Sequence, residues 1–158
     1  MLQPGQPAPE FELPDADMNV VSLNDFRDHS NVVLYFYVRD GTPSCTAEAI
    51  DFSDLDDEFA KLKSVVVGVS MDDCDAHGLF RDKHGLSVQL LADVEGEVCG
   101  RYGVLHDKDL DGKTKKCIQR STFIIDRKGL LKHVMYGVNA RGHAAQVLDL
   151  VRSVANCK

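Results

Sequence analysis

The amino-acid sequence predicts an α/β fold in which helices flank a central mixed β-sheet. Two apolar runs rich in β-branched and aromatic residues, 32–38 and 65–69, read as buried strands, and each precedes a segment with helical periodicity. A third run, 121–125, is joined to 130–136 by the sequence Asp-Arg-Lys-Gly, which is typical of a hairpin turn. Strand–helix repeats favour parallel pairing and a hairpin requires antiparallel pairing, so the sheet should contain both.

The segments between these strands fit helices. After the first strand, apolar residues recur at intervals of three and four, which makes one helical stripe: Ala49, Phe52, Leu55, Phe59 and Leu62. A second helix is predicted over 76–84, and Gly85 is suited to end it. Further along, 88–91 reads as a short strand, 96–102 as one or two helical turns, and 143–154 as a closing helix.

Length and charge narrow the function classes. The 158 residues fit a single domain, 1–158, that can bury a core without disulfides or a structural metal. The formal net charge is −7, from 18 Lys and Arg against 25 Asp and Glu, which argues against nucleic acid or an anionic membrane as the main partner. No signal-peptide pattern opens the sequence, and no apolar run approaches the roughly 20 residues that a bilayer requires. A cytoplasmic protein is therefore expected.

Five cysteines with no CxxC pair argue against a secreted disulfide framework. One of them, Cys45, lies where the first strand gives way to the first helix. Thr42 is a good helix N-cap and Pro43 a good first residue, which places Cys45 among backbone N–H groups that lack intrahelical partners. These donors and the helix dipole favour a thiolate at a sheet edge where ligands commonly bind. Cys45 is therefore a candidate nucleophile, although unpaired cysteines are often simply buried.

The surroundings of Cys45 resemble the active-site motif of the peroxiredoxins. The peroxiredoxin Q group, also called bacterioferritin comigratory proteins, has a motif similar to residues 42–48, TPSCTAE, and to the preceding YFY at 35–37. Further landmarks of the group are matched in order along nearly the whole chain, at 5–11, 67–70, 90–93, 102–104 and 120–129.

This resemblance implies a thioredoxin-like fold and a thiol-dependent peroxidase that reduces hydrogen peroxide or organic hydroperoxides, with no metal and no bound cofactor. It assigns Cys45 as the peroxidatic nucleophile, Thr42 as its hydroxyl partner and Arg120 as the cation that completes the pocket. Glu48, one turn beyond Cys45, is expected to brace an arginine. The resemblance also implies recycling by thioredoxin or another thiol reductant, and a monomer or homodimer is expected.

Three positions depart from the pattern of the group. Val38 stands where a proline is usual, and it keeps bulk to shield Cys45 but lacks the rigid ring. Ile50 and Arg81 stand at two positions where members of the group carry a resolving cysteine. The best-placed internal candidate is Cys74, which follows the second strand and should emerge at the same sheet edge as Cys45. Cys117 and Cys157 would require a longer reach or a second subunit. A chain without any internal resolving cysteine is an equal alternative.

Other functions stay open. A peroxide sensor or redox relay would use the same cysteine without efficient recycling, whereas the missing CxxC pair disfavours a disulfide reductase. A zinc site could be drawn from Cys74, His77, Cys99 and His106. No second closely spaced pair completes that site. The basic run 113–116 is expected to be a solvated loop, with Cys117 in a polar connection and Cys157 beside the terminus.

Overall fold

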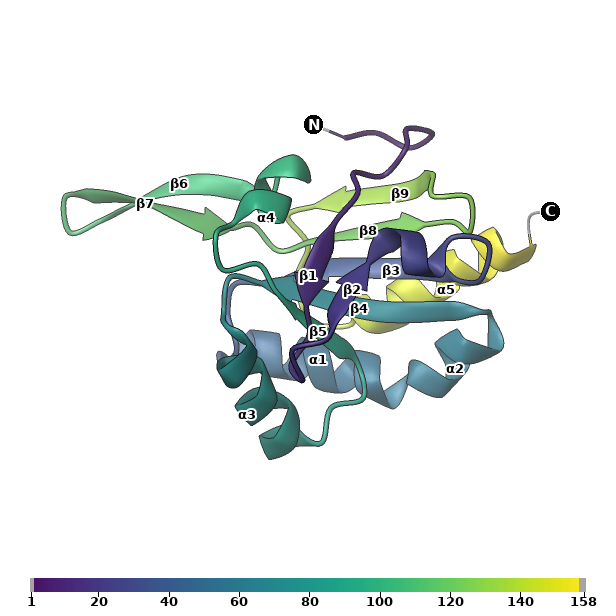
Figure 1. Cartoon of the computed structure of the whole chain (residues 1–158), viewed down its shortest axis with the longest axis horizontal. Helices are drawn as coiled ribbons and strands as arrows, with labels where there is room; N and C mark the ends of the chain where they lie inside the picture. The colour runs from purple at the N-terminus through teal and green to yellow at the C-terminus, as the bar shows by residue number, and fades with distance from the viewer. Residues whose placement is uncertain (1, 157–158) are drawn as a thin grey trace.

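The computed structural model describes residues 2–156 and has a five-stranded sheet at its centre, in the order β5-β4-β3-β8-β9 (Figure 1). Its strands are β3 (Asn31–Phe36), β4 (Ser64–Ser70), β5 (Gln89–Ala92), β8 (Ser121–Ile125) and β9 (Leu131–Tyr136). Strands β3, β4 and β5 are parallel, whereas β8 is antiparallel to both β3 and β9. The predicted mixed sheet is confirmed.

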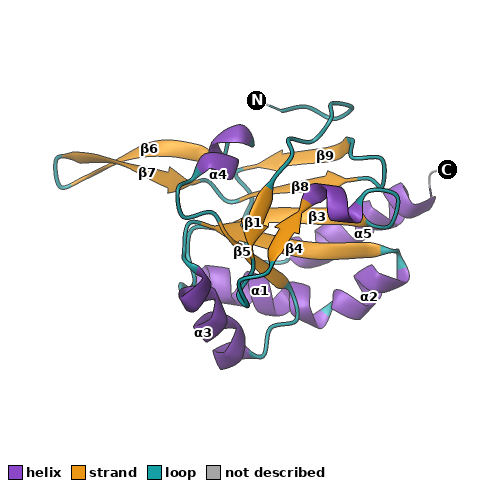
Figure 2. Ribbon diagram, viewed as in Figure 1, coloured by secondary structure: helices purple, strands orange, loops and turns teal. Residues whose placement is uncertain are grey.

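Helices cover one face of this sheet (Figure 2). They are α1 (Pro43–Asp54), α2 (Asp56–Lys61), α3 (Cys74–His84) and α5 (His143–Asn156). Their apolar stripes share a core with alternate residues of β3, Val33 and Tyr35. Gly68 of β4 lies directly opposite Tyr35, and a Cβ atom there would lie 2.7 Å from the Tyr35 ring, so glycine leaves the space that this ring fills.

The N-terminal segment and a short helix cover the other face. The segment contains β1 (Glu12–Pro14), β2 (Val20–Ser22) and the 3-10 helix η1 (Leu23–Phe26), and the short helix is α4 (Glu97–Arg101). These elements pack on Val32, Leu34 and Phe36, which point away from the helical face. Because successive residues of a strand point to opposite faces and both faces are covered, every residue of β3 is buried.

A hairpin of two strands, β6 (Leu105–Leu110) and β7 (Lys113–Ile118), projects from the body of the molecule (Figures 1 and 2). The expectation of a loop over 113–116 is therefore wrong. The strands lack an apolar alternation because most side chains of β7 face solvent, so periodicity could not reveal them. Asp111 and Gly112 connect the strands, both with positive φ (53° and 77°), and this Asp-Gly pair was the available signal for a hairpin.

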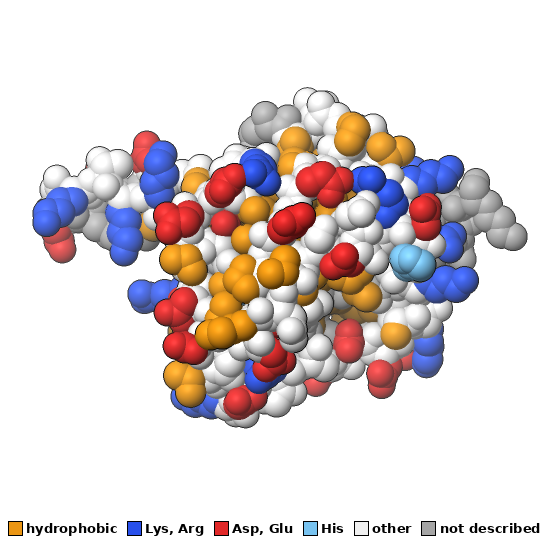
Figure 3. All heavy atoms as spheres, in the orientation of Figure 1, with side chains coloured by type: hydrophobic (Ala, Val, Ile, Leu, Met, Phe, Trp, Pro, Cys, Tyr) orange, Lys and Arg blue, Asp and Glu red, His pale blue; other side chains and the backbone are white. Residues whose placement is uncertain are grey.

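The predicted helices are present with shifted boundaries. The single stripe expected over 49–62 is divided between α1 and α2 at Leu55, whose φ of −97° and ψ of 3° interrupt the helix. Helix α3 begins before the predicted residue 76 because Asp73 is its N-cap and accepts a hydrogen bond from the Ala76 N–H at 2.8 Å. Between residues 2 and 156, no helix is both long and apolar enough to cross a bilayer. Figure 3 shows acidic and basic side chains interspersed on one face.

Candidate active site

Two cysteines lie in the first turns of helices that follow neighbouring parallel strands. Strand β3 pairs in parallel with β4, with Phe36 opposite Val69 near their carboxyl ends. Cys45 lies in α1, which follows β3, and Cys74 is the first residue of α3, which follows β4. The two turns therefore emerge at the same edge of the sheet, as the sequence predicted.

The first turn of α1 holds Cys45 in a capped and buried position. Thr42 is the N-cap residue, with extended backbone angles, and its Oγ1 accepts a hydrogen bond from the Cys45 N–H at 3.3 Å. Pro43 follows as the first helical residue, where its missing N–H costs nothing. The Cys45 side chain is only 1% exposed, so its contacts are with protein groups rather than bulk water.

Arg120 is the cation beside this cysteine. It immediately precedes β8, and Ser121 of β8 pairs with Phe36 at the end of β3. Because the two strands are antiparallel, Arg120 lies beside the turn that contains Cys45. Its Nη2 lies 3.2 Å from the Cys45 Sγ and 3.0 Å from the Ser44 Oγ. The guanidinium therefore faces the sulfur directly, and the structure brings together residues 75 positions apart in the sequence.

Glu48 anchors the other side of the guanidinium. Its Oε1 accepts a hydrogen bond from Arg120 Nη1 at 2.7 Å, and its side chain is fully buried. Burial raises the pKa of Glu48 to about 7, although the charge of Arg120 and its hydrogen bond oppose this shift. Among the described residues, nothing donates a hydrogen bond to Glu48 Oε2. Burial also disfavours the charge of Arg120, but Glu48 and Cys45 outweigh that effect and raise the pKa of Arg120.

Cys74 has the opposite electrostatic environment. The carboxylate of Asp73 caps its helix, and Asp75 follows in the first turn. Partial burial raises the pKa of the Cys74 thiol, and the carboxylates of Asp15, Asp73 and Asp75 raise it further. The thiolate of Cys74 is therefore disfavoured even though the residue sits at a helix N-terminus.

Two further described cysteines, Cys99 and Cys117, lie on other elements than Cys45. Cys99 is buried on the opposite face of the sheet, as expected, and its N–H donates to the Asp93 carboxylate at 2.8 Å. Burial and that carboxylate raise the pKa of the Cys99 thiol. Cys117 belongs to β7 and pairs with His106 of β6 rather than lying in a loop. Cys157 falls outside the described residues.

The remaining sequence candidates can also be placed. Val38 follows β3 and is 43% exposed, and a shielding role for it stays a prediction. The zinc set is contradicted: in the part of the chain that the structure describes, the one group of ligand atoms that gathers is Asp40, Asp72 and His77. Sequence reasoning missed the contact of Ser44 with Arg120, although Ser44 lies inside the quoted motif.

A comparison with protein-family models matches residues 4–134, most of the chain, to the AhpC/TSA family. The chain belongs to the AhpC/TSA family. Among its curated relatives, the putative peroxiredoxin bcp of Coxiella burnetii is 42% identical over 147 residues, covering 93% of this chain and 97% of the relative. Peroxiredoxin Bcp of Escherichia coli is 36% identical over 154 residues, covering 98% of each chain.

Solved structures agree with this assignment. A bacterioferritin comigratory protein of Xanthomonas campestris, described for its alkyl peroxide reduction activity, has a TM-score of 0.87 at 31% identity and covers 92% of each chain. A mutant of PrxQ from Xylella fastidiosa has a TM-score of 0.91 at 27% identity over 99% of each chain. The thioredoxin-like fold and the Bcp/PrxQ group are therefore confirmed, and the protein is a peroxiredoxin, a thiol peroxidase.

Proposed function

We propose that Cys45 is the nucleophile that reduces hydrogen peroxide and organic hydroperoxides. The contact of 3.2 Å between Arg120 Nη2 and Cys45 Sγ carries this assignment. A guanidinium at this distance stabilises a thiolate and can hold a peroxide oxygen beside it, because its fork presents several donors at once. Cys74 has carboxylates as neighbours instead, which disfavour the same ionisation.

The reaction is a nucleophilic displacement at oxygen. The Cys45 thiolate attacks one peroxide oxygen, the S–O bond forms, and the O–O bond breaks. Its electron pair leaves with the second oxygen, which departs as hydroxide or alkoxide and takes a proton from solvent. Cys45 becomes a sulfenic acid and the peroxide is reduced to water or an alcohol. The Arg120 guanidinium is aimed at the region where negative charge shifts, so it stabilises the transition state.

Thr42 can serve both as the helix cap and as a donor to the peroxide. The cap uses Thr42 Oγ1 as an acceptor for the Cys45 N–H. The hydroxyl hydrogen is left with a contact of 3.5 Å to the Arg39 carbonyl, which is long for a hydrogen bond between oxygens. We therefore assign this hydrogen to the peroxide, and the two roles do not compete. Glu48 acts behind Arg120, holding the guanidinium in the orientation that faces the sulfur.

We further propose that Cys74 resolves the sulfenic acid and that thioredoxin, or another thiol reductant, reduces the resulting disulfide. The parallel pairing of β3 and β4 supports this route, because it sends both cysteines to one sheet edge. A disulfide needs Cα atoms within about 7 Å, and unwinding of the first turn of α1 would let Cys45 approach Cys74. The loss of the thiolate on oxidation weakens its attraction to the helix dipole and favours that unwinding.

A peroxide sensor or redox relay is the second candidate, and the charges around Cys74 favour it. Thiolates rather than thiols attack a sulfenic acid, and the raised pKa of Cys74 lowers its thiolate fraction. Arg81 occupies one of the usual resolving positions and is held by ion pairs with Asp17 and Asp82. Slow internal resolution would leave the sulfenic acid of Cys45 available to a partner protein.

One experiment separates these functions: peroxide consumption by the purified protein with thioredoxin, its reductase and NADPH. Sustained turnover supports a recycling peroxidase, and a single turnover supports the relay. Peptide mapping without reduction, after one equivalent of peroxide, is expected to show Cys45 linked to Cys74. A Cys45 sulfinic acid with alkylated Cys74 would instead show dependence on an external thiol. Sedimentation would decide between the monomer and homodimer, and fractionation of the source cells would test the cytoplasmic location.

A further inference from the structure

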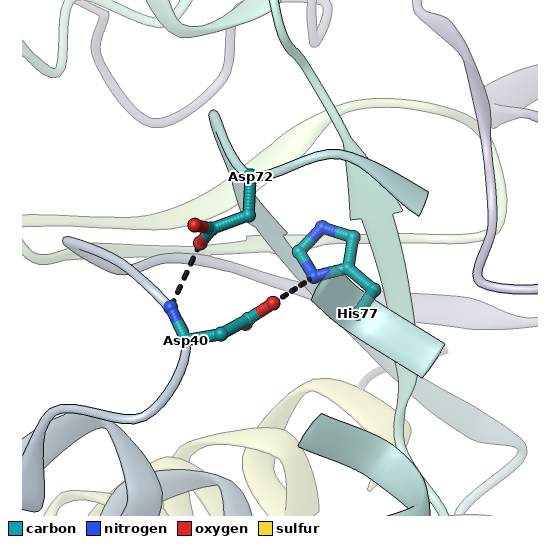
Figure 4. A group of neighbouring side chains, drawn as sticks. All are labelled: Asp40, Asp72 and His77. Atoms are coloured by element: carbon teal, nitrogen blue, oxygen red, sulfur yellow. Dashed lines mark hydrogen bonds and ion pairs between the residues drawn. The ribbon is translucent and has the colours of Figure 1, made fainter. Parts of the chain in front are cut away.

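Asp40, two residues before Thr42, has a buried partner in α3 (Figure 4). One carboxylate oxygen of Asp40, Oδ2, lies 2.6 Å from Nδ1 of His77, and the other, Oδ1, accepts a hydrogen bond from the Tyr37 hydroxyl at 2.6 Å. The Asp40 backbone N–H donates to the Asp72 carboxylate at 2.8 Å. The His77 side chain is fully buried and that of Asp40 is 8% exposed. The loop before α1 is thus fixed to α3 and to the loop after β4.

The hydrogen-bond pattern fixes a proton between Asp40 and His77. Nε2 of His77 lies 2.9 Å from the Leu91 carbonyl oxygen, which has no hydrogen to donate, so Nε2 carries a proton. Without a second proton, the Nδ1 lone pair of His77 would face the lone pairs of the Asp40 carboxylate at 2.6 Å, which is repulsive. One shared proton therefore joins the two side chains as a charge-assisted hydrogen bond.

A cation does not account for the same cluster. Asp40, Asp72 and His77 do offer ligand atoms within 4.8 Å of one another. Two ligands at about 2 Å from a tetrahedral metal ion lie more than about 3 Å apart, which exceeds the 2.6 Å between Asp40 and His77. The Asp72 Oδ2 atom already accepts hydrogen bonds from the Asp40 N–H and the Ser70 hydroxyl. The cluster is a hydrogen-bonded network with its polar atoms satisfied.

We propose that Asp40 and His77 are positioning residues for peroxide reduction, and that their shared proton fixes the start of the segment that presents Thr42 and Cys45. We call this pair the Asp40–His77 clamp. One residue, Gly41, separates Asp40 from the N-cap Thr42, so displacement of Asp40 is transmitted to the cap and to Cys45. This inference rests on the proposal that Cys45 is the nucleophile, and it adds a pair of residues that fixes the position of Cys45. Reaction rates are sensitive to such displacement, since an error of about 1 Å can cost roughly 100-fold.

Polar groups from neighbouring elements face the clamp. Asp72 faces Asp40 from the loop after β4, and its carboxylate accepts the hydrogen bond of the Asp40 N–H. Tyr37 and Tyr35 face the clamp from the side of β3, and burial raises the pKa of both hydroxyls well above the usual value, so they stay neutral. The clamp is therefore bordered by one carboxylate and two neutral hydroxyls.

The test compares Asp40→Ala with Asp40→Asn. The alanine variant leaves His77 Nδ1 without its partner. The asparagine variant can donate an N–H to neutral Nδ1 and still accept from Tyr37, which restores the geometry without the charge. Because the chain contains no Trp, Cys45 oxidation by hydrogen peroxide is followed by quenched flow, alkylation and mass spectrometry. We expect a loss of about tenfold in the oxidation rate for Asp40→Ala, with most of the rate restored in Asp40→Asn.

Asn31→Ala is the matched control. Asn31 is buried at the start of β3, the opposite end of the strand from Asp40, and its amide donates to the Ser64 hydroxyl at 3.4 Å. It should lose stability without losing the oxidation rate. Equal losses in Asp40→Ala and Asn31→Ala, or no recovery in Asp40→Asn, would reduce the clamp to a structural contact and overturn the proposal.

Nitrogen-15 NMR of the His77 ring supplies a readout independent of the reaction. Both ring nitrogens are expected to carry protons in the wild type, and Nε2 alone in Asp40→Asn. A wild-type His77 ring with a single N–H would contradict the proposal that His77 and Asp40 share a proton. Peroxide reaction of Cys45→Ser is measured in parallel. If Cys45→Ser still consumes peroxide, while the His77 ring carries two protons and the Asp40 variants behave as expected, the assignment of Cys45 as nucleophile fails but the Asp40–His77 clamp stands.

Discussion

The first turns of α1 and α3 have one backbone design and opposite electrostatics. In each, a parallel strand ends, a side chain caps the helix, and a cysteine follows within the first turn. At Cys45 the cap is the neutral Thr42 and the nearest charge is Arg120. At Cys74 the cap is Asp73, and further carboxylates lie nearby. The helix N-terminus is common to both sites, so it cannot by itself explain a reactive cysteine.

The difference lies in what the rest of the fold delivers to each turn. Arg120 reaches Cys45 because β8 pairs with β3, on the side of β3 opposite β4. Asp15 belongs to the N-terminal segment and forms an antiparallel β-bridge with Leu91 of β5. Its carboxylate contributes to the raised pKa of Cys74. A helix dipole contributes at most about 1–2 kcal/mol, which neighbouring full charges can exceed. The sheet order therefore brings a cation to the Cys45 turn, and the N-terminal segment brings a carboxylate to the Cys74 turn, which supports the proposal that Cys45 is the nucleophile.

Removing the sulfur of Cys45 or of Cys74 is expected to have the largest effect and to separate the roles of the two turns. Cys45→Ser is expected to reduce peroxide consumption to the uncatalysed background, because serine has no accessible anion at neutral pH. Cys74→Ser should retain the first oxidation and lose only disulfide formation. Single-turnover peroxide consumption measures the first oxidation in each variant, and peptide mapping without reduction measures disulfide formation. Normal consumption by Cys45→Ser, or its loss in Cys74→Ser, would reverse the roles assigned to the two turns.

Arg120→Met removes the cation while keeping a long apolar stem. Oxidation of Cys45 is expected to slow by about 100- to 1,000-fold, comparable to the loss of one donor to a developing charge. Arg120→Lys should recover only part of the rate, since an ammonium cannot hold Glu48 and the sulfur with two nitrogens at once. The control is Arg120→Met with Glu48→Gln, which removes the unpaired buried carboxyl. If the double variant regains the wild-type rate, the cation has no direct role.

Much of this arrangement followed from the sequence, for local reasons. The motif at 42–48 placed Thr42 and Cys45 on a helix start, and the alternation of strands and helices predicted the mixed sheet. The position of Arg120 beside Cys45 was predicted from the family resemblance alone, because it depends on the register of β8 against β3, which no local pattern specifies. The carboxylates around Cys74 include Asp15, a neighbour that only the packed fold supplies. The network of Asp40 and His77 was missed for the same reason.

Glu48→Gln tests how the buried carboxyl behind Arg120 makes stability depend on pH. The pKa of Glu48 rises from 4.5 to about 7 on folding, so between these values the folded protein keeps a proton that the unfolded chain has lost. Stability from this group is therefore complete below pH 4.5 and declines as pH rises toward 7, by about 3 kcal/mol in all. Urea unfolding at several pH values should show the free energy of unfolding of the wild type falling relative to that of Glu48→Gln as pH rises over that range. A constant difference would contradict the raised pKa of Glu48.

The smallest expected effect comes from making the α3 turn resemble the α1 turn. Asp73→Asn with Asp75→Asn removes two charges beside Cys74, and asparagine keeps the N-cap. The pKa of the Cys74 thiol should fall, since these carboxylates contribute to its rise. Alkylation of Cys74 by iodoacetamide at pH 8, measured in a Cys45→Ser background, is expected to become about two- to threefold faster, because the rate follows the thiolate fraction.

Asp82→Asn with Asp75 and Asp73 intact is the control for net charge, because Asp82 lies later in α3 and pairs with Arg81. An equal acceleration in that variant would assign the effect to overall charge rather than to the first turn. With Cys45 present, the Asp73 and Asp75 substitutions should also raise the rate of Cys45–Cys74 disulfide formation after one equivalent of peroxide, in the same proportion. Faster alkylation without faster disulfide formation would show that chain geometry, such as the unwinding of α1, rather than the ionisation of Cys74 limits its attack. A product with no Cys45–Cys74 link would show that Cys74 is not the resolving residue.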